Sequence, residues 1–317
     1  MGRVQEDALL RSEICAWILG RVEELLLRIF LLGGIVCIAQ AAELKEKIAA
    51  IAAEAKGKVS VGCEMPGVKL DCNFNAAAKP PMQSVFKLPL ALAALQLVDQ
   101  GKMGLDQNVR FRPEDRILPK TYSPLQDKYP QANVDVPLRE LLRLAVSFSD
   151  NAAADTVMRE IGGATVVQKY IDGTGIRGFH LVDNEATLHR EKQAQYRNWF
   201  EPRAAVQLML KLHEQKMLKP ETTAVVEKWL LETQTGMKRI RALLPAGTDV
   251  LHKTGTSGVT DGLAHATNDI ALVKLPGGKY VAIAVFVTDS RADEATREAV
   301  MAKIAKAIYD AAVNQKP

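Results

Sequence analysis

A serine and a lysine lie three residues apart at the head of the most apolar stretch of this 317-residue chain. Ser84 and Lys87 open the segment Ser84–Asp99, SVFKLPLALAALQLVD, whose composition is typical of a buried helix. Because side chains three apart share one face of a helix, the amine would lie beside the hydroxyl. A buried lysine is costly unless it is paired or used, and here it can help to take the proton of a nucleophilic serine. The pair therefore indicates nucleophilic catalysis, although an N-cap serine beside a solvated lysine gives the same spacing.

Two further polar motifs follow along the chain. Ser149-Asp150-Asn151 comes shortly after the end of a helix predicted over Pro137–Val146, which has proline at its first turn. Lys253-Thr254-Gly255 lies within a strand predicted over Asp249–Thr256. A second hydroxyl, an amide and a second amine add hydrogen-bond donors and acceptors to the first pair. Each motif is common alone, but the three in this order indicate one active site.

The elements that must position these motifs are predicted from a change of hydrophobic period along the chain. A helix at Ala42–Lys56 and a hairpin at Val59–Phe74 precede the Ser84 segment, and a block of helices then runs to Glu232. The period then changes to that of strands, and an amphipathic helix at Ala292–Ala312 ends the pattern. The strands predicted in this part are Asp249–Thr256, Asp269–Leu275 and Tyr280–Asp289, the last two joined by a Pro-Gly-Gly-Lys turn.

The simplest packing of these elements is an α+β fold with two lobes. Residues 42–80 and 233–317 would form one lobe, an antiparallel sheet covered by the terminal helices. Residues 81–232 would form an inserted all-α lobe, with the active site at the interface between the lobes. Two polar segments, Arg110–Val136 and Leu181–Trp199, are predicted to be irregular, and the second to be a long functional loop.

Residues 1–41 are predicted to be a secretory signal peptide rather than part of the fold. The apolar run Ile29–Ile38 follows Arg28 and is too short to span a bilayer, and Ala39-Gln40-Ala41 is a typical cleavage site. The alternative is a membrane anchor. We expect a periplasmic or secreted protein with no stable membrane insertion. Cleavage would leave Cys63 and Cys72, which either form a disulfide across the hairpin or are two small buried side chains.

Several classes of partner and cofactor are not expected. The net charge of +4 is spread without a basic stripe or an aromatic-interleaved patch, which argues against nucleic acid as a partner. The five histidines fall in none of the spacings typical of metal-ligating helices, so we predict no metal and no other cofactor. We expect a monomer that binds a small-molecule substrate.

The three motifs together resemble those of the class A serine β-lactamases and of the penicillin-binding proteins. The resemblance covers about residues 42–315. It extends to the flanking sequences of two motifs, which are similar to those of the PER/VEB-like branch of class A. These are Pro81-Met82-Gln83-Ser84-Val85-Phe86-Lys87 and His252-Lys253-Thr254-Gly255-Thr256-Ser257-Gly258. The resemblance implies the two-lobe β-lactamase/DD-peptidase fold. It also implies a hydrolase that opens the β-lactam amide of penicillins and cephalosporins and confers antibiotic resistance.

The resemblance assigns a role to each residue of the three motifs. Ser84 would be the nucleophile, and Lys87 would accept its proton or tune its neighbours. Ser149 would pass a proton to the leaving ring nitrogen of the β-lactam. The remaining assignments concern substrate binding: Asn151 for the side-chain amide, Lys253 and Thr254 for the carboxylate, and the backbone N–H groups of Ser84 and Thr256 for the oxyanion hole.

Further residues receive roles by the same resemblance. Asp150 would brace its loop rather than act chemically. Tyr122 matches the position at which the family walls the entrance of the site with an aromatic ring; otherwise it is an exposed loop tyrosine. Arg239 stands where some relatives supply a second cation beside Lys253; otherwise it is a solvated surface charge. Arg241 would have a structural role.

Glu185 is the expected base of hydrolysis, within Glu185-Ala186-Thr187-Leu188-His189. The family pattern in this loop is E-x-x-L-N, and here His189 replaces the asparagine and would help to hold the deacylating water. Whether Lys87 or Glu185 activates Ser84 during acylation stays open at this point.

The neck of the same loop departs from the family, most of which closes it with an arginine–aspartate salt bridge. The corresponding residues here are Asp183 and Asn198, so that salt bridge is not expected. We expect Asp155 to accept a hydrogen bond from Asn198 and so to close the loop instead.

Two other functions share the three motifs. A penicillin-binding DD-peptidase acts on peptidoglycan and has no need of Glu185. A β-lactam sensor stays acylated and needs a membrane-spanning partner segment, which the mature sequence lacks. Because Glu185 serves neither alternative, a β-lactam hydrolase is the preferred interpretation.

Overall fold

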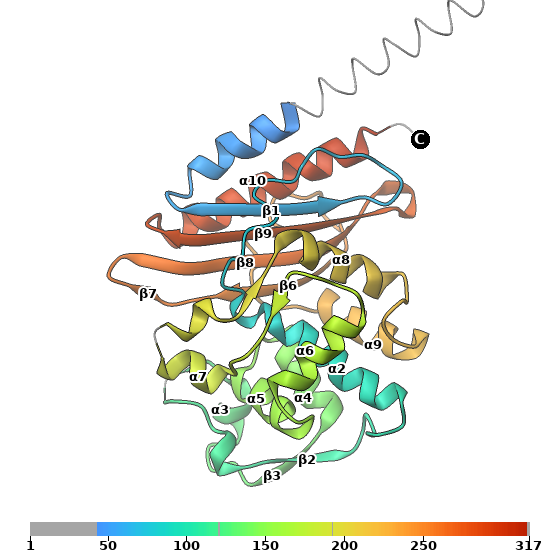
Figure 1. Cartoon of the computed structure of the whole chain (residues 1–317), viewed down its shortest axis with the longest axis vertical. Helices are drawn as coiled ribbons and strands as arrows, with labels where there is room; N and C mark the ends of the chain where they lie inside the picture. The colour runs from blue at the N-terminus through green and yellow to red at the C-terminus, as the bar shows by residue number, and fades with distance from the viewer. Residues whose placement is uncertain (1–42, 120, 192, 316–317) are drawn as a thin grey trace, which may run out of the picture. The chain divides into compact units, whose positions relative to one another are not determined.

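The computed structural model describes residues 43–119, 121–191 and 193–315 (Figure 1). The predicted signal peptide, 1–41, lies outside these residues. Residues from Lys45 onward form one compact unit, so the bounds of the two lobes stay a prediction. Within the described ranges, no helix has both the length and the apolar character needed to cross a bilayer.

A single antiparallel sheet is formed by strands from both ends of the chain. Its order is β1–β9–β8–β6, with the short β7 paired to β8 (Figure 1). Val59 of the first strand pairs with Val287 of the last, which confirms the prediction that the two ends of the chain share one sheet. The strands are β1 (Lys58–Glu64), β6 (Val250–Thr256), β7 (Val259–Thr260), β8 (Leu263–Lys274) and β9 (Tyr280–Ser290).

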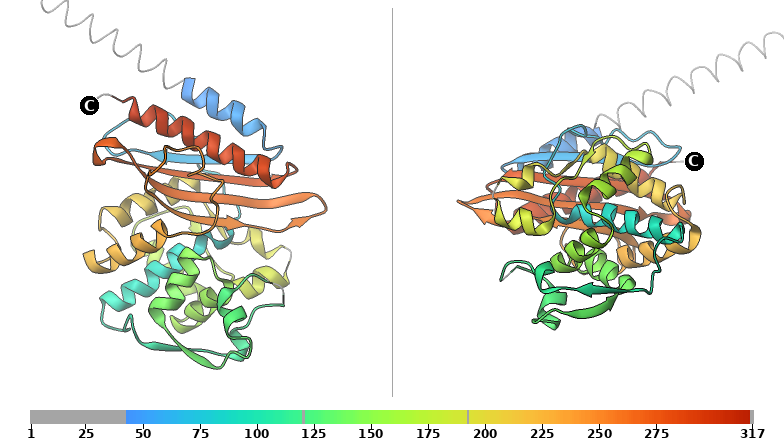
Figure 2. Two further views of the ribbon diagram at one scale, coloured as in Figure 1. Left: turned by 180° about the vertical axis from the view of Figure 1, so that it is seen from behind. Right: turned by 60° about the horizontal axis from the view of Figure 1, so that its bottom comes forward.

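Helices cover both faces of this sheet, and β8 and β9 are therefore buried along nearly their whole length. Helix α10 (Glu294–Val313) packs on β8 and β9, while α8 (Pro202–His213) packs on β1, β8 and β9 from the opposite face (Figures 1 and 2). Residues 45–53 are also helical, and Lys303 of α10 donates a hydrogen bond to Glu54 just beyond them. The predicted α+β class is confirmed.

Several helices pack around α2 (Lys87–Asp99), whose segment Lys87–Leu95 is completely buried. Apolar side chains point in every direction around this helix, so it must be enclosed by others. It contacts α4, α5, α6 and α9. The helices of the structure not yet given are α3 (Pro124–Lys128), α4 (Leu138–Ser147), α5 (Asn151–Glu160), α6 (Ala164–Gly173), α7 (Glu185–Arg190) and α9 (Pro220–Leu231), with 3-10 helices η1 (Gln83–Phe86), η2 (Pro113–Asp115), η3 (Ala194–Tyr196) and η4 (Pro276–Gly278).

Both segments that were predicted to be irregular contain regular structure. Two strands, β2 (Asn108–Phe111) and β3 (Val134–Pro137), pair at the ends of the first segment. Each has only four residues, too few for its alternation to stand out in the sequence. The second segment contains α7 and η3, and β4 (Phe179–His180) pairs with β5 (Trp199–Phe200) across its ends. The prediction that these segments lack regular elements is therefore wrong.

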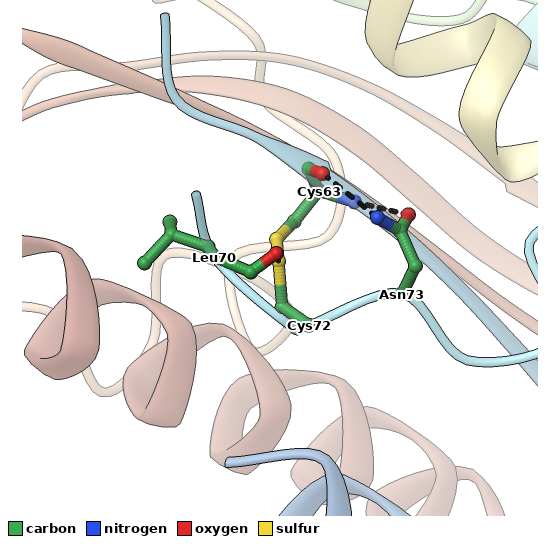
Figure 3. The surroundings of a disulfide bond; sticks show 4 residues. All are labelled: Cys63, Leu70, Cys72 and Asn73. Atoms are coloured by element: carbon green, nitrogen blue, oxygen red, sulfur yellow. Dashed lines mark hydrogen bonds between the residues drawn. A yellow bond between two sulfur atoms is a disulfide. The ribbon is translucent and has the colours of Figure 1, made fainter. Parts of the chain in front are cut away.

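The predicted hairpin at Val59–Phe74 is only partly formed. Its first arm is β1, but its second arm contacts the first through isolated bridges, including one between Val61 and Phe74. The two cysteines form a disulfide within this segment (Figure 3). Asn73 reinforces it, because its side chain bonds the backbone N–H and C=O of Cys63. Of the two alternatives for the cysteines, the structure contains the disulfide.

Replacing Cys63 and Cys72 together by alanine is expected to lower the free energy of unfolding by about 2–3 kcal/mol, since the bridge closes a short loop in the unfolded chain. The two residues are nine apart in sequence. Turnover should be unaffected, because β1 and the motif-bearing β6 lie at opposite edges of the sheet. Urea unfolding with and without reductant measures the effect, and equal midpoints for parent and variant without reductant would contradict it.

Candidate active site

The nucleophile candidate, Ser84, lies in η1 directly before α2. The preceding residue, Gln83, has φ of 49°, a left-handed conformation that turns the chain into the helix. Asn268 of β8 holds this segment on the sheet by donating to the carbonyl oxygens of Pro81 (2.9 Å) and Met82 (3.1 Å). Gly255 of β6 passes so close that a Cβ there would collide with the Met82 carbonyl oxygen. The lysine-bearing strand β6 is thereby brought against the residues that flank Ser84.

Glu185 lies beside both members of the first motif. The Ser84 hydroxyl donates to Glu185 Oε1 at 3.1 Å, and Lys87 Nζ lies 2.9 Å from the same oxygen. Burial alone would raise the pKa of Glu185, but the charge of Lys87, with His189, brings it to about 2. Glu185 is therefore a buried carboxylate at neutral pH, aimed at the hydroxyl group.

Lys87 is fully buried and connects the first motif to the second. Besides Glu185, its Nζ donates to the carbonyl oxygen of Ser149 (2.7 Å) and to Asn151 Oδ1. Ser149 has φ of 58°, and α5 begins immediately after Asp150. The tight backbone turn thus lets one ammonium group bond two residues of the same motif.

The third motif meets the second through Lys253, which is also fully buried. Its Nζ donates to Ser149 Oγ at 3.0 Å and to the carbonyl oxygen of Thr254 at 2.9 Å. Burial, and then the nearby charge of Lys87, holds the pKa of Lys253 well below its usual range. The structure therefore brings all three motifs and Glu185 into one cluster.

Arg239 is buried rather than solvated, so its interpretation as a free surface charge is wrong. Its guanidinium forms an ion pair with Glu298 (3.1 Å) and donates to Thr256 Oγ1 (2.8 Å). It also donates to the carbonyl oxygens of Gly255 (3.3 Å) and Asn268 (3.0 Å). Arg239 thus lies against the end of β6, and its contact with substrate stays a prediction.

Asp150 braces its loop, as predicted. Its buried carboxylate accepts from Ser123 Oγ (2.7 Å) and from the backbone N–H of Leu125 (2.6 Å), and it caps α5 through the N–H of Ala153 (2.9 Å). Tyr122, next to this anchored turn, is 55% exposed. Its role at the entrance of the site stays a prediction.

His189 lies near Glu185 at the end of α7. Its Nε2 is 3.5 Å from Glu185 Oε2 and 3.4 Å from Asn151 Nδ2. The loop also has a link that the motifs did not indicate, from Gln83 Nε2 to Gln195 Oε1 at 3.0 Å. The residue before the nucleophile is thereby tied to the loop that carries the carboxylate.

The predicted hydrogen bond between Asp155 and Asn198 is wrong, because each side chain bonds the loop backbone instead. Asp155 accepts from the N–H groups of Glu185 and Ala186, both at 2.8 Å. Asn198 accepts from the N–H groups of residues 182 and 183 and donates to the carbonyl oxygen of Asp183 (2.8 Å). The loop is therefore held at two separate places, one at Glu185 and one at the neck.

The neck also has an ion pair that was not expected. Asp183 accepts two hydrogen bonds from Arg197, at 2.7 and 2.9 Å. The arginine directly precedes Asn198 in the sequence. The prediction that positions 183 and 198 form no salt bridge is confirmed, and the neck instead contains an ion pair between Asp183 and Arg197 that the motif comparison did not indicate.

Asp155 is expected to make stability depend on pH. Burial and then the charge of Glu185 raise its pKa to about 7 from 3.8. Between about pH 4 and 7 the folded state thus binds more protons than the unfolded state, so stability falls as pH rises through this window. Relative to the parent, Asp155→Asn should gain about 1–4 kcal/mol in free energy of unfolding between pH 4 and pH 8.

Urea unfolding of parent and Asp155→Asn at four pH values in this range measures the change. The comparison uses the change with pH in the difference between the two free energies of unfolding. Any pH-independent cost of placing an amide beside the backbone N–H groups therefore cancels. A stability difference that stays constant, or that shrinks as pH rises, would show that this carboxyl group does not titrate in the window.

The helix-covered sheet, together with a cluster that contains Ser84, a buried carboxylate and two buried lysines, defines a serine acyl-transfer enzyme. Residues 43–312 match the model of the Beta-lactamase enzyme family. The chain belongs to this family.

Individual relatives show to which branch of the family the chain belongs. Extended-spectrum beta-lactamase PER-1 of Pseudomonas aeruginosa is 40% identical over 271 residues, which are 86% of this chain and 88% of that protein. Beta-lactamase VEB-1 of the same organism is 35% identical over 74% of this chain and 79% of its own length. The chain is a class A serine β-lactamase of the PER/VEB branch, as the motifs predicted.

Solved structures agree with this assignment. A β-lactamase from Chitinophaga pinensis has a TM-score of 0.82 and 41% identity, covering 85% of this chain and 99% of that one. The TLA-1 extended-spectrum β-lactamase has a TM-score of 0.83 and 37% identity, covering 86% and 99%. The predicted two-lobe fold is confirmed by both.

Proposed function

We propose that this enzyme hydrolyses the β-lactam amide of penicillins and cephalosporins through an acyl-enzyme on Ser84, which water activated by Glu185 then releases. The observation that carries the proposal is the position of the Glu185 carboxylate. It is buried, ionised and within hydrogen-bond distance of both the Ser84 hydroxyl and the Lys87 ammonium.

In acylation, Ser84 Oγ attacks the β-lactam carbonyl carbon and its proton leaves to the Lys87–Glu185 pair. The hydroxyl already donates to Glu185, which favours this carboxylate as the first acceptor. The carbonyl oxygen becomes an oxyanion, stabilised by the backbone N–H groups of Ser84 and Thr256. As the amide C–N bond breaks, the Ser149 hydroxyl gives its proton to the ring nitrogen. This hydroxyl is reprotonated by the proton taken from Ser84, which passes from Glu185 through Lys87, so that Glu185 is a carboxylate again before deacylation.

Substrate binding uses the polar groups around this centre. Lys253 and Thr254 bind the substrate carboxylate, and Arg239 supports them by holding Thr256. Asn151, whose Oδ1 accepts from Lys87, presents its amide to the side chain of the substrate. Tyr122 walls the entrance.

In deacylation, a water between Glu185 and the ester loses a proton to the carboxylate, and its oxygen attacks the ester carbonyl. The C–O bond to Ser84 then breaks, and the serine oxygen takes the proton back. His189 and Asn151 lie close enough to Glu185 to help hold this water. A DD-peptidase or an acylated sensor needs no carboxylate at this place.

The test is a chromogenic cephalosporin with the purified mature protein. Continuous turnover supports hydrolysis, whereas a single stoichiometric burst supports an acyl trap or a peptidase. Ser84→Ala should show neither. A panel of a penicillin, an oxyimino cephalosporin and a carbapenem then defines the substrate range; PER-1 and TLA-1 are extended-spectrum enzymes by name, and we propose the same for this chain.

We also propose that residues 1–41 direct export and that the mature enzyme acts as a monomer in the periplasm or outside the cell. The Cys63–Cys72 disulfide supports an oxidising compartment. Mass spectrometry of the exported protein tests the cleavage after Ala41.

A further inference from the structure

A cavity of about 420 Å³ opens beside the candidate site. Gln83, His189 and Thr256 border it, so it adjoins Ser84 and the end of β6. Its other walls come from the loop after α7 and from the β7–β8 hairpin. The volume is in the range that holds a drug-sized group. A substrate bound at Ser84 can therefore extend its acyl side chain into this space.

Arg291 lies in the wall of this cavity, just after β9. Its backbone N–H is fixed by the carbonyl oxygen of Lys56 at 3.1 Å. Its Nη1 approaches the hairpin, 4.0 Å from the point where a Cβ on Gly262 would lie. Within the part of the chain that the structure describes, its guanidinium has no hydrogen bond and no ion pair.

The other charged and imidazole groups of the cavity differ from Arg291. The imidazole of His265 is already bonded to the hydroxyl of Tyr196 at 2.7 Å. Asp261 carries the opposite charge, but it lies exposed in the two-residue turn of the hairpin, with φ of 53°. A planar guanidinium with free donors is the protein group best matched to a carboxylate.

We propose that this cavity binds acyl side chains that end in a carboxylate, with Arg291 as the counter-ion and Asp261 as an opposing charge that weakens the preference. The inference rests on the proposed hydrolysis, since it concerns the side chain of the same substrate. It predicts a selectivity between substrates that share one β-lactam nucleus. Neutralising Arg291 should lower this selectivity, and neutralising Asp261 should raise it.

A matched pair of substrates tests the selectivity. Cefixime and cefdinir share the aminothiazole oxime and the vinyl nucleus, but the oxime of cefixime carries a carboxymethyl group. The ratio of their kcat/KM values cancels any loss of folded protein. Arg291→Gln should lower the cefixime/cefdinir ratio about 5- to 10-fold, as expected for a charged hydrogen bond that is partly exposed. Arg291→Lys should keep part of the preference.

Two further variants separate charge at this place from other effects. Asp261→Asn should raise the ratio about twofold, and Arg177→Gln, which removes an exposed arginine after α6, should leave it unchanged. In parent protein, raising the salt concentration from about 0.05 to 0.5 M should reduce the preference for cefixime, because screening weakens exposed charge pairs. A ratio unchanged in Arg291→Gln, or shifted in the same direction by both cavity variants, overturns the inference.

The acylation rates of both compounds, measured by intact mass in a Glu185→Gln background, separate this inference from the proposed function. If parent protein is acylated but never turns over, the proposed hydrolysis is wrong. The ratio of the two acylation rates still measures the effect of Arg291 on substrate selectivity. If turnover is normal and the Arg291 variants leave both ratios unchanged, the function stands and the inference fails.

Discussion

Glu185→Gln is expected to retain partial acylation by a β-lactam, with Lys87 as the remaining acceptor of the Ser84 proton, and to release the product about 100- to 10,000-fold more slowly than the parent. The amide keeps the size of the carboxylate and can still bond Ser84 and Lys87, but it cannot take a proton from water. Intact-mass spectrometry should show the adduct accumulate on the variant, and stopped assays should show one burst per molecule. The parent should show no lasting adduct with the same substrate.

Glu221→Gln provides the matched control for this variant. Glu221 lies exposed in the first turn of α9, away from the three motifs, so its loss should leave turnover unchanged. Undiminished turnover in Glu185→Gln would remove this residue from the role of base. Equal adduct lifetimes for the two variants would have the same meaning.

The site could be predicted from sequence because its chemistry depends on particular side chains. Only a few residue types can act as nucleophile, ammonium and carboxylate, and short spacings such as that from Ser84 to Lys87 are preserved by a helical turn. The partners of Asp155 could not be predicted in the same way. They are backbone N–H groups, which almost every residue has, so the sequence contains no signal for them. The backbone partners of a polar side chain can therefore be identified only from the folded structure of the loop.

In the fold, too, local features could be predicted from sequence and distant pairings could not. The periodicity of β8 and β9 and the turn between them indicate a local hairpin, and the structure contains it. The partner of β1 is different, because Val59–Phe74 carries a local turn signal but β1 pairs along its length with β9 at the other end of the chain. A turn signal reports only neighbours in sequence. The choice between a local and a distant partner is decided by which pairing buries the apolar face.

Lys87→Met is expected to be the most damaging substitution in the site for stability. It leaves the Glu185 carboxylate buried without its ammonium partner, and breaking a buried pair in this way costs about 3–5 kcal/mol. The pKa of Glu185 should then rise, because burial raises it and Lys87 no longer lowers it. A smaller fraction of Glu185 would then be ionised and able to act as base at neutral pH. The residual kcat/KM should therefore increase with pH over a range in which the parent is flat.

The double variant Lys87→Met/Glu185→Gln separates the loss of the pair from the loss of the lysine. It lacks the same hydrogen bonds to Ser149 and Asn151 but contains no unpaired charge, so its free energy of unfolding should lie above that of Lys87→Met. Urea unfolding of the four proteins of this cycle measures the coupling between the two side chains. If the double variant is no more stable than Lys87→Met, the ion pair is not what holds Glu185 ionised. Its low pKa would then have to come from hydrogen bonds alone, and His189 would be the next residue to replace.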